Sequence, residues 1–349
     1  MKVTIKDIAD KANVSTATVS RVFNNTAYVS DDTKQKVIEI AKKFNYKPRN
    51  YSKNSNNDDA KEDENNTIGI IFSFEDPFNE YEHPFYTKVL GGIQKYFQNY
   101  NYQLFFQSIV NDYNKDKDSM DELINKQRIK GFIIIGYDID HRLISYFSDK
   151  EIPIILVDNN PDDNNLNCVL NDNYNGAKDM VDYLIKLGHE KIAFLGGPLN
   201  HFSLKERFHG YKAVLEGNNL SVDENLVKIC SPSFKIDDGY QAVLELMKNN
   251  NIKPTSICAA NDSLAIGAMK ALIELGYSIP DDISVTGFDD IEMANYTNPP
   301  LTTVKIAKQE MGLHAGKRLH ELINGELPTS MRQVISVSVI ARKSTAVIT

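Results

Sequence analysis

The sequence predicts a small all-α domain followed by a larger α/β body built on parallel sheets. Three observations predict this. Residues 1–48 hold three short helical patterns, residues 49–66 are polar and acidic, and the remainder alternates short β-branched runs with longer helical patterns. The length of 349 residues exceeds what one hydrophobic core usually fills, which also favours several domains.

The first domain is predicted to hold three helices, over 5–12, 16–23 and 32–44. Side chains that favour helix N-caps precede them, namely Thr4, Ser15, and Ser30 or Asp31. A tight turn at Asn13-Val14 separates the first two helices, and Asn tolerates the left-handed backbone such a turn often needs. Two helices joined in this way indicate a helix-turn-helix motif, whose second helix can lie in the major groove of DNA.

Charge supports a nucleic-acid partner for this domain. Residues 1–50 hold ten Lys/Arg against five Asp/Glu, whereas the remaining residues hold 29 against 42. The predicted base-contacting face of the second helix consists of Thr16, Ala17, Ser20 and Arg21. The predicted phosphate contacts are Thr4, Ser15, Ser20, Asn24 and Thr33. The alternative, a helical bundle that binds protein, does not account for the basic excess.

Residues 49–66 are predicted to be a linker. Only Tyr51 and Ala60 are apolar or nearly so, and such a segment cannot bury enough surface to offset its ordering entropy. Because composition and charge sign both change across it, we expect domains at 1–48 and 67–349.

The body is predicted to form parallel sheets covered by helices. Strand patterns occupy 68–73, 103–109, 131–135, 153–157, 191–196, 256–260, 284–288 and 334–340. Helix patterns lie between them, at 86–98, 174–187, 239–247, 263–275 and 309–323. Two sheets account for this length better than one.

Polar side chains follow several predicted strands, where open α/β sheets bind ligands. They are Asp158, Asn261, Asp262, Asp289 and Asp290, and Arg207 is expected to open a helix after the strand at 191–196. Carboxylates, an amide and a guanidinium suit the hydroxyls of a sugar. Asp after a strand is also a common N-cap; this alternative is favoured for Asp262 and Asp290, and the ligand role for the other four.

An aromatic segment follows the first predicted strand and carries Phe78, Tyr81, Phe85 and Tyr86. At a cleft mouth these rings would favour an oligosaccharide, because sugar C–H faces pack on aromatic rings. The alternative is that Phe85 and Tyr86 are core residues at a helix entry.

Enzyme and metal motifs are absent from the sequence. It has no Walker A, G-x-S-x-G or H-E-x-x-H pattern, and its seven histidines are scattered. We therefore predict no catalytic residue, no cofactor and no metal. The three cysteines are far apart in the sequence and are predicted to be reduced thiols. Because no export or membrane segment is visible either, we expect a cytoplasmic protein.

The segment VTIKDIADKANVSTATVSRVFNNTAYVSDDTKQKVIEIAKKFNYKP closely resembles the DNA-binding domain of the LacI/GalR family of bacterial repressors. In the body, LGHEKIAFLGGP, ERFHGYKAVL, ANDSLAIGAMKAL, IPDDISVTGFDD and PPLTTVKI resemble the effector domain of that family. The resemblance implies a homodimer on pseudo-palindromic operator DNA, with a sugar effector held by a periplasmic-binding-protein-like domain. It implies an N-subdomain of about 67–169 and 303–331 and a C-subdomain of about 170–302 and 332–349.

The same resemblance implies ligand contacts at Asp158, Arg207, Asn261 and Asp289, and an aromatic wall at Phe234. The long segment before His83-Pro84-Phe85-Tyr86 is similar to that of maltose-operon repressors, which implies Phe85 as a further contact. The linker departs from the family: Ser55 stands where relatives carry the leucine of a DNA-bound hinge helix. A sugar-binding protein of the transport type is the main alternative function, and the DNA-binding module argues against it.

Overall fold

A computed structural model describes residues 4–24, 29–44, 66–74, 84–137, 139–160, 166–230, 235–248, 253–326 and 329–348. The chain forms two compact units, Met1–Asp63 and Glu64–Thr349. Within the described residues, no helix is long and apolar enough to cross a membrane.

The first unit is a three-helix domain. Its helices are α1 (Ile5–Ala12), α2 (Thr16–Asn24) and α3 (Asp31–Lys43). The predicted cap is confirmed, because Thr4 and Asp7 form a capping box at the start of α1. The predicted left-handed turn residue is also confirmed, because Asn13 has a φ of 54°. The helices enclose one small core, formed by Ile8, Ala9, Ala12, Val19, Val22, Val37 and Ala41.

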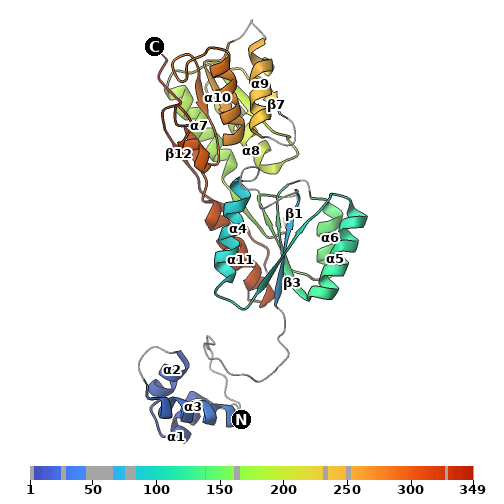
Figure 1. The fold of residues 1–349 in the computed structure, drawn as a ribbon, viewed down its shortest axis with the longest axis vertical. Helices are drawn as coiled ribbons and strands as arrows, with labels where there is room; N and C mark the ends of the chain where they lie inside the picture. The colour runs from blue at the N-terminus through green and yellow to red at the C-terminus, as the bar shows by residue number, and fades with distance from the viewer. Residues whose placement is uncertain are drawn as a thin grey trace. The chain divides into compact units, whose positions relative to one another are not determined.

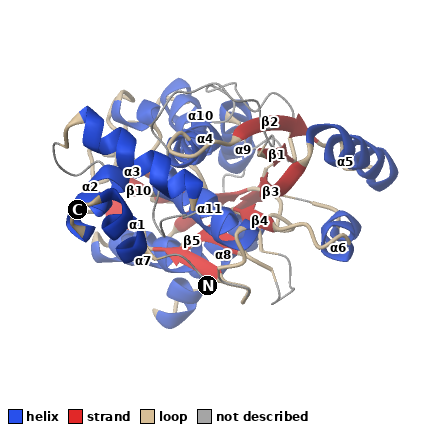
Figure 2. Cartoon of the chain, turned by 90° about the horizontal axis from the view of Figure 1, so that it is seen from below, coloured by secondary structure: helices blue, strands red, loops and turns tan. Residues whose placement is uncertain are grey.

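A six-stranded parallel sheet organises one half of the second unit, in the order β11-β5-β4-β3-β1-β2. Its strands are β1 (Thr67–Phe72), β2 (Gln103–Ser108), β3 (Ile129–Ile135), β4 (Ile154–Val157), β5 (Cys168–Asn171) and β11 (Arg332–Ile335). Helices α4 (Pro84–Phe97) and α11 (Lys308–Ile323) pack on one face (Figures 1 and 2). Helices α5 (Tyr113–Gln127) and α6 (His141–Asp149) pack on the other.

Alternating side chains of these strands divide between two cores. Ile133 and Ile135 face α4 and α11, whereas Phe132 and Ile134 face α5 and α6. Helices α4 and α11 approach closely because glycines meet at their crossing. A Cβ on Gly92 would lie 2.0 Å from the carbonyl oxygen of Gln309, and one on Gly312 would lie 2.0 Å from that of Val89.

A four-stranded parallel sheet organises the other half, in the order β7-β6-β8-β9. Its strands are β6 (Ile192–Gly196), β7 (Val227–Ile229), β8 (Ser256–Ala259) and β9 (Ser284–Thr286). Helices α7 (Asn173–Lys186) and α8 (Phe202–Gly217) pack on one face. Helices α9 (Ile236–Lys248) and α10 (Asp262–Glu274) pack on the other. Two 3₁₀ turns, η1 (Glu224–Leu226) and η2 (Glu292–Asn295), lie in its loops.

Two of the expected subdomain boundaries are wrong. The strand β11 was expected in the C-subdomain, but it pairs with β5 at the edge of the six-stranded sheet. The strand β10 (Thr303–Lys305) was expected in the N-subdomain. Instead it pairs with β12 (Ser338–Ile340), and bridges join Thr302 to Thr286 in β9 and Lys305 to Asp289 in the loop that follows. Both strands have three or four residues and lie where the chain crosses between sheets, so their pairing partner is not encoded in their local pattern.

Candidate functional site

The predicted DNA-contacting face of α2 lies opposite its core face. Val19 and Val22 are buried, whereas Thr16, Ala17 and Arg21 are exposed and Ser20 is half-buried. The exposed face therefore offers a guanidinium and small side chains, which are the groups that read base edges in the major groove.

Two of the hydroxyls predicted to contact phosphate, those of Thr4 and Ser15, cap helices, and a third, that of Thr33, lies in the first turn of α3. Thr4 Oγ1 lies 2.7 Å from Asp7 Oδ2, Ser15 Oγ accepts a hydrogen bond of 3.0 Å from Thr18 N, and Thr33 Oγ1 lies 2.8 Å from Ser30 Oγ. These residues thus stand at helix N-termini, where the backbone itself favours an anion. The side chain of Asn24 lies outside the described residues.

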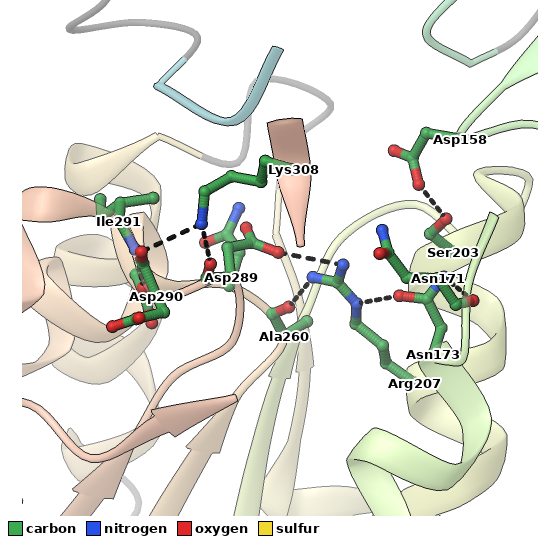
Figure 3. A network of polar contacts seen from close by, with 12 residues as sticks. Asp158, Asn171, Asn173, Ser203, Arg207, Ala260, Asp289, Asp290, Ile291 and Lys308 are labelled. Carbon is green, nitrogen blue, oxygen red and sulfur yellow. Dashed lines mark hydrogen bonds and ion pairs between the residues drawn. The ribbon is translucent and has the colours of Figure 1, made fainter. Parts of the chain in front are cut away.

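In the second unit, a polar network lies where the carboxyl ends of the two sheets meet (Figure 3). Asp158 follows β4, and its carboxylate accepts hydrogen bonds from Tyr86 Oη at 3.0 Å and from Ser203 Oγ at 2.5 Å. Tyr86 belongs to α4 and Ser203 to α8, so this carboxylate joins the two halves. Burial raises the pKa of Asp158.

Arg207 stands at the centre of the network and is almost fully buried. Its guanidinium donates to Asn173 Oδ1 at 2.9 Å and to the Ala260 carbonyl at 2.6 Å, and lies 3.0 Å from Asp289 Oδ1. The same group lies 3.8 Å from the ring centroid of Phe288. Arg207 does not open α8, as the sequence suggested, but lies within it. These contacts hold the planar guanidinium in one orientation, so that its positive charge has a fixed position.

Lys308 closes the opposite side of the network. It is the first residue of α11, and its amino group donates to the carbonyl oxygens of Asp289 and Asp290. Both carbonyls belong to residues with positive φ, 109° and 54° respectively. Burial lowers the pKa of Lys308. This contact is a second link between the two halves.

The two aspartates expected to be N-caps, Asp262 and Asp290, do not cap a helix: Asn261 is the N-cap of α10 and Ile291 that of η2. Both are bound by other parts of the protein. Asp262 is fully buried, and its carboxylate accepts hydrogen bonds from Ile291 N at 2.8 Å and Thr303 Oγ1 at 2.5 Å. Burial, followed by the nearby Asp289 charge, raises the pKa of Asp262 to about 8. Asp290 Oδ1 lies 2.6 Å from Arg342 Nη2.

The six predicted effector contacts have four different outcomes. Asp158, Arg207 and Asp289 share the network, and neither aspartate caps a helix. Asn261 caps α10 through a 2.8 Å hydrogen bond to Leu264 N, which is the alternative that its position after a strand left open. Phe85 is buried in the core beside Tyr86, and Phe234 lies outside the described residues.

Sequence reasoning missed Ser203, Asn173, Asn171 and Lys308. Asn171 ends β5, and within the described part of the chain its buried Oδ1 accepts no hydrogen bond. A buried acceptor without a partner is costly, so this atom is suited to a ligand donor. Among the described residues, no group of three or more His, Cys, Asp or Glu is placed to hold a metal ion.

Two grooves open on either side of the network. One, of about 770 Å³, is lined by Lys308, Asp290, Met293, Tyr296 and their neighbours. The other, of about 500 Å³, is lined by residues that follow β2, β3, β4 and β6. The network therefore lies between the two α/β halves of the second unit, with one groove on each side.

Comparison with known proteins agrees with this architecture. Residues 4–49 match the model for bacterial regulatory proteins of the lacI family, and residues 65–345 match that for periplasmic binding proteins and the sugar binding domain of the LacI family. The chain belongs to the LacI family. It is a ligand-regulated, DNA-binding transcriptional repressor, and since members of this family are regulators and not enzymes, the prediction of a non-enzyme is confirmed.

Three LacI-family relatives illustrate the likeness. A probable transcriptional repressor ExuR of Bacillus subtilis is 33% identical over 329 residues, which are 92% of each chain. The lac repressor dimer bound to operator and the anti-inducer ONPF has a TM-score of 0.72 at 27% identity, and the likeness covers 99% of this chain and 100% of that one. A LacI family regulator from Enterococcus faecium with bound ribose has a TM-score of 0.70 at 27% identity, covering 81% and 100%.

Proposed function

We propose that this repressor binds a pseudo-palindromic operator as a homodimer and responds to a sugar held in the cleft of its second unit. The observation that carries the proposal is the buried Arg207–Asp289 pair at the carboxyl ends of facing sheets, with Asp158 beside it. Such polar groups, already desolvated and aligned, suit the paired hydroxyls of a carbohydrate.

On DNA, α2 is the recognition helix. Thr16, Ala17, Ser20 and Arg21 face the bases, and Thr4, Ser15, Asn24 and Thr33 hold the backbone. The exposure of Arg21 on α2 supports this assignment, as does the lac repressor dimer on its operator. A dimer would place two such helices about one DNA turn apart. The domains we propose are 1–48 for DNA binding, 49–66 as a linker, and 67–349 for effector binding and dimerisation.

In the cleft, Asp158, Arg207 and Asp289 contact the sugar, and Asn171 and Tyr86 stand close enough to join them. The ribose bound to the Enterococcus faecium relative supports this ligand class. The sequence suggested a maltose-type oligosaccharide from the aromatic segment before Pro84. Residues 75–83 of that segment lie outside the described residues, so the narrower class stays a prediction.

The test uses the full chain in two measurements. Rounds of selection from random duplexes should enrich a pseudo-palindrome, and the Arg21→Ala variant should bind it more weakly. A panel of sugars should then raise the melting temperature of the wild type, because a ligand at 100 times its Kd adds about 2.7 kcal/mol to stability. Asp289→Ala should remove this increase while leaving DNA binding intact. Sugar stabilisation that survives in Asp289→Ala would contradict the proposed cleft contacts.

A further inference from the structure

A groove rich in asparagine extends the cleft beyond Asp158. It has a volume of about 500 Å³, within the range of small-molecule pockets. Four loops line it, each at the carboxyl end of a strand, together with the first residues of α6 and α8. Its polar side chains are Asn111, Asp140, His141, Asn159, Asn160, Asn200 and Lys205. We call this the amide groove.

The amide groove adjoins the polar network through residues that are neighbours in sequence. Asn159 follows Asp158 directly, and Phe202 in the groove wall precedes Ser203. The Asp158–Ser203 contact lies on one side of Arg207, whereas Lys308 and Asp290 lie on the other (Figure 3). A ligand held by Arg207 and Asp289 therefore reaches the amide groove by passing the Asp158 carboxylate.

The chemistry of the amide groove suits uncharged hydroxyl groups. An amide side chain both donates and accepts hydrogen bonds, as a hydroxyl does. Within the described residues, the side chains of Asn111, Asn159 and Asn200 make no hydrogen bond to the protein. The Asp140 carboxylate is already bound by Arg142, at 2.6 Å from its Nη2. The lining thus offers several open amide groups, together with the side chains of His141 and Lys205.

The groove on the opposite side has a different character. Its lining combines the lysines Lys88, Lys305 and Lys308 with the acids Glu292 and Glu310 and with exposed apolar side chains. A neutral sugar unit there would lie against charged and apolar side chains, whereas the amide groove offers it several amide groups.

We propose that the amide groove binds a second, uncharged sugar unit of the effector, so that the effector is at least a disaccharide. This rests on the proposed function, because the first unit is the one held by Arg207 and Asp289. Asn159 and Asn200, from opposite halves of the second unit, hold the second sugar between them.

Isothermal titration calorimetry on the full chain tests this with D-glucose, maltose, cellobiose, D-galactose and lactose. The variants are Asn159→Ala with Asn200→Ala, which removes two amides, and Asn200→Tyr, which fills the groove. The matched control is Asn295→Ala, an asparagine that lines the opposite groove. Asn200 and Asn295 are exposed and Asn159 is half-buried, and melting temperatures report whether each variant folds.

We expect at least one disaccharide to bind the wild type tenfold or more tightly than its constituent monosaccharides. The ratio of disaccharide to monosaccharide affinity should fall about 3- to 10-fold in the double variant, fall further in Asn200→Tyr, and stay unchanged in Asn295→Ala. A monosaccharide that binds as tightly as its disaccharides, or a ratio that persists in both groove variants, would overturn the proposal. If no probe binds the wild type, the proposal of a carbohydrate effector is wrong, and the proposal of a second sugar unit is wrong as well.

Discussion

Replacing Arg207 with methionine removes the charge at the centre of the cleft while keeping a long side chain. The arginine side chain is 5% exposed and that of Asp289 is 11% exposed. Removing one partner of a buried ion pair costs about 3–5 kcal/mol, because the other charge stays buried without compensation. The Asn173 amide and the Ala260 carbonyl would also lose their donor. We therefore expect Arg207→Met to lower the free energy of unfolding of the second unit by about 3–5 kcal/mol.

Urea denaturation followed by circular dichroism measures this cost, and Arg142→Met is the matched control. Arg142 also pairs with a carboxylate, at 2.6 Å, but its side chain is 68% exposed, so its loss should leave no measurable change. In Arg207→Met with Asp289→Asn, part of the loss should be recovered because no unpaired carboxylate remains. Equal stability of the Arg207→Met and Arg142→Met variants would refute the reasoning, since it would mean that water reaches the Arg207–Asp289 pair freely.

Three further variants test separate parts of the account. The pKa of Asp262 is about 8 in the folded state, whereas its ordinary value is 3.8. Folding therefore takes up a proton between pH 3.8 and about pH 8, and the free energy of unfolding falls as pH rises through this range. Asp262→Asn should flatten that fall in melting temperature between pH 5 and 8, and an unchanged slope would show that Asp262 is ionised when folded. Arg21→Ala should cost about 1–3 kcal/mol of operator affinity and relax the sequence preference at one base pair per half-site. An equal loss of affinity on every duplex would mean that Arg21 contacts only phosphate. Thr4→Ala should destabilise the first unit by about 0.5–2 kcal/mol in urea titrations, because it removes the capping box of α1, and no loss would mean that the cap is dispensable.

Local features of the fold were predictable because the residues that specify them are neighbours in sequence. The helix α1 begins and ends at the predicted residues, and its cap and left-handed turn were found as expected. The strands β1 to β4 were found within two residues of their predicted bounds because each contains a short run rich in apolar and β-branched or aromatic residues. Short edge strands such as β11 were not assigned correctly, because their pairing depends on the path of the whole chain.

The site was predictable in part for the same reason. Asp158 and Asp289 follow apolar runs, and that position alone places them at the sheet edge. Ser203 and Lys308 carry no such signal, because their partners Asp158 and Asp289 lie 45 and 19 positions away along the chain and are met only after folding. The role of Asn261 was not predictable, because an N-cap and a ligand contact have the same sequence pattern. The hydrogen bond that Leu264 N donates to its side chain shows that it caps α10.

The central claim is that a sugar in the cleft controls DNA binding by the other unit. Fluorescence anisotropy of the selected operator, with and without the sugar that stabilises the wild type most, measures this coupling. Because allosteric coupling usually amounts to about 1–3 kcal/mol, the sugar should change the operator affinity of the wild type about 5- to 150-fold. Asp289→Ala should bind the operator as the sugar-free wild type does, and its affinity should not respond to sugar. An operator affinity that responds equally in both proteins, or in neither, would contradict the account.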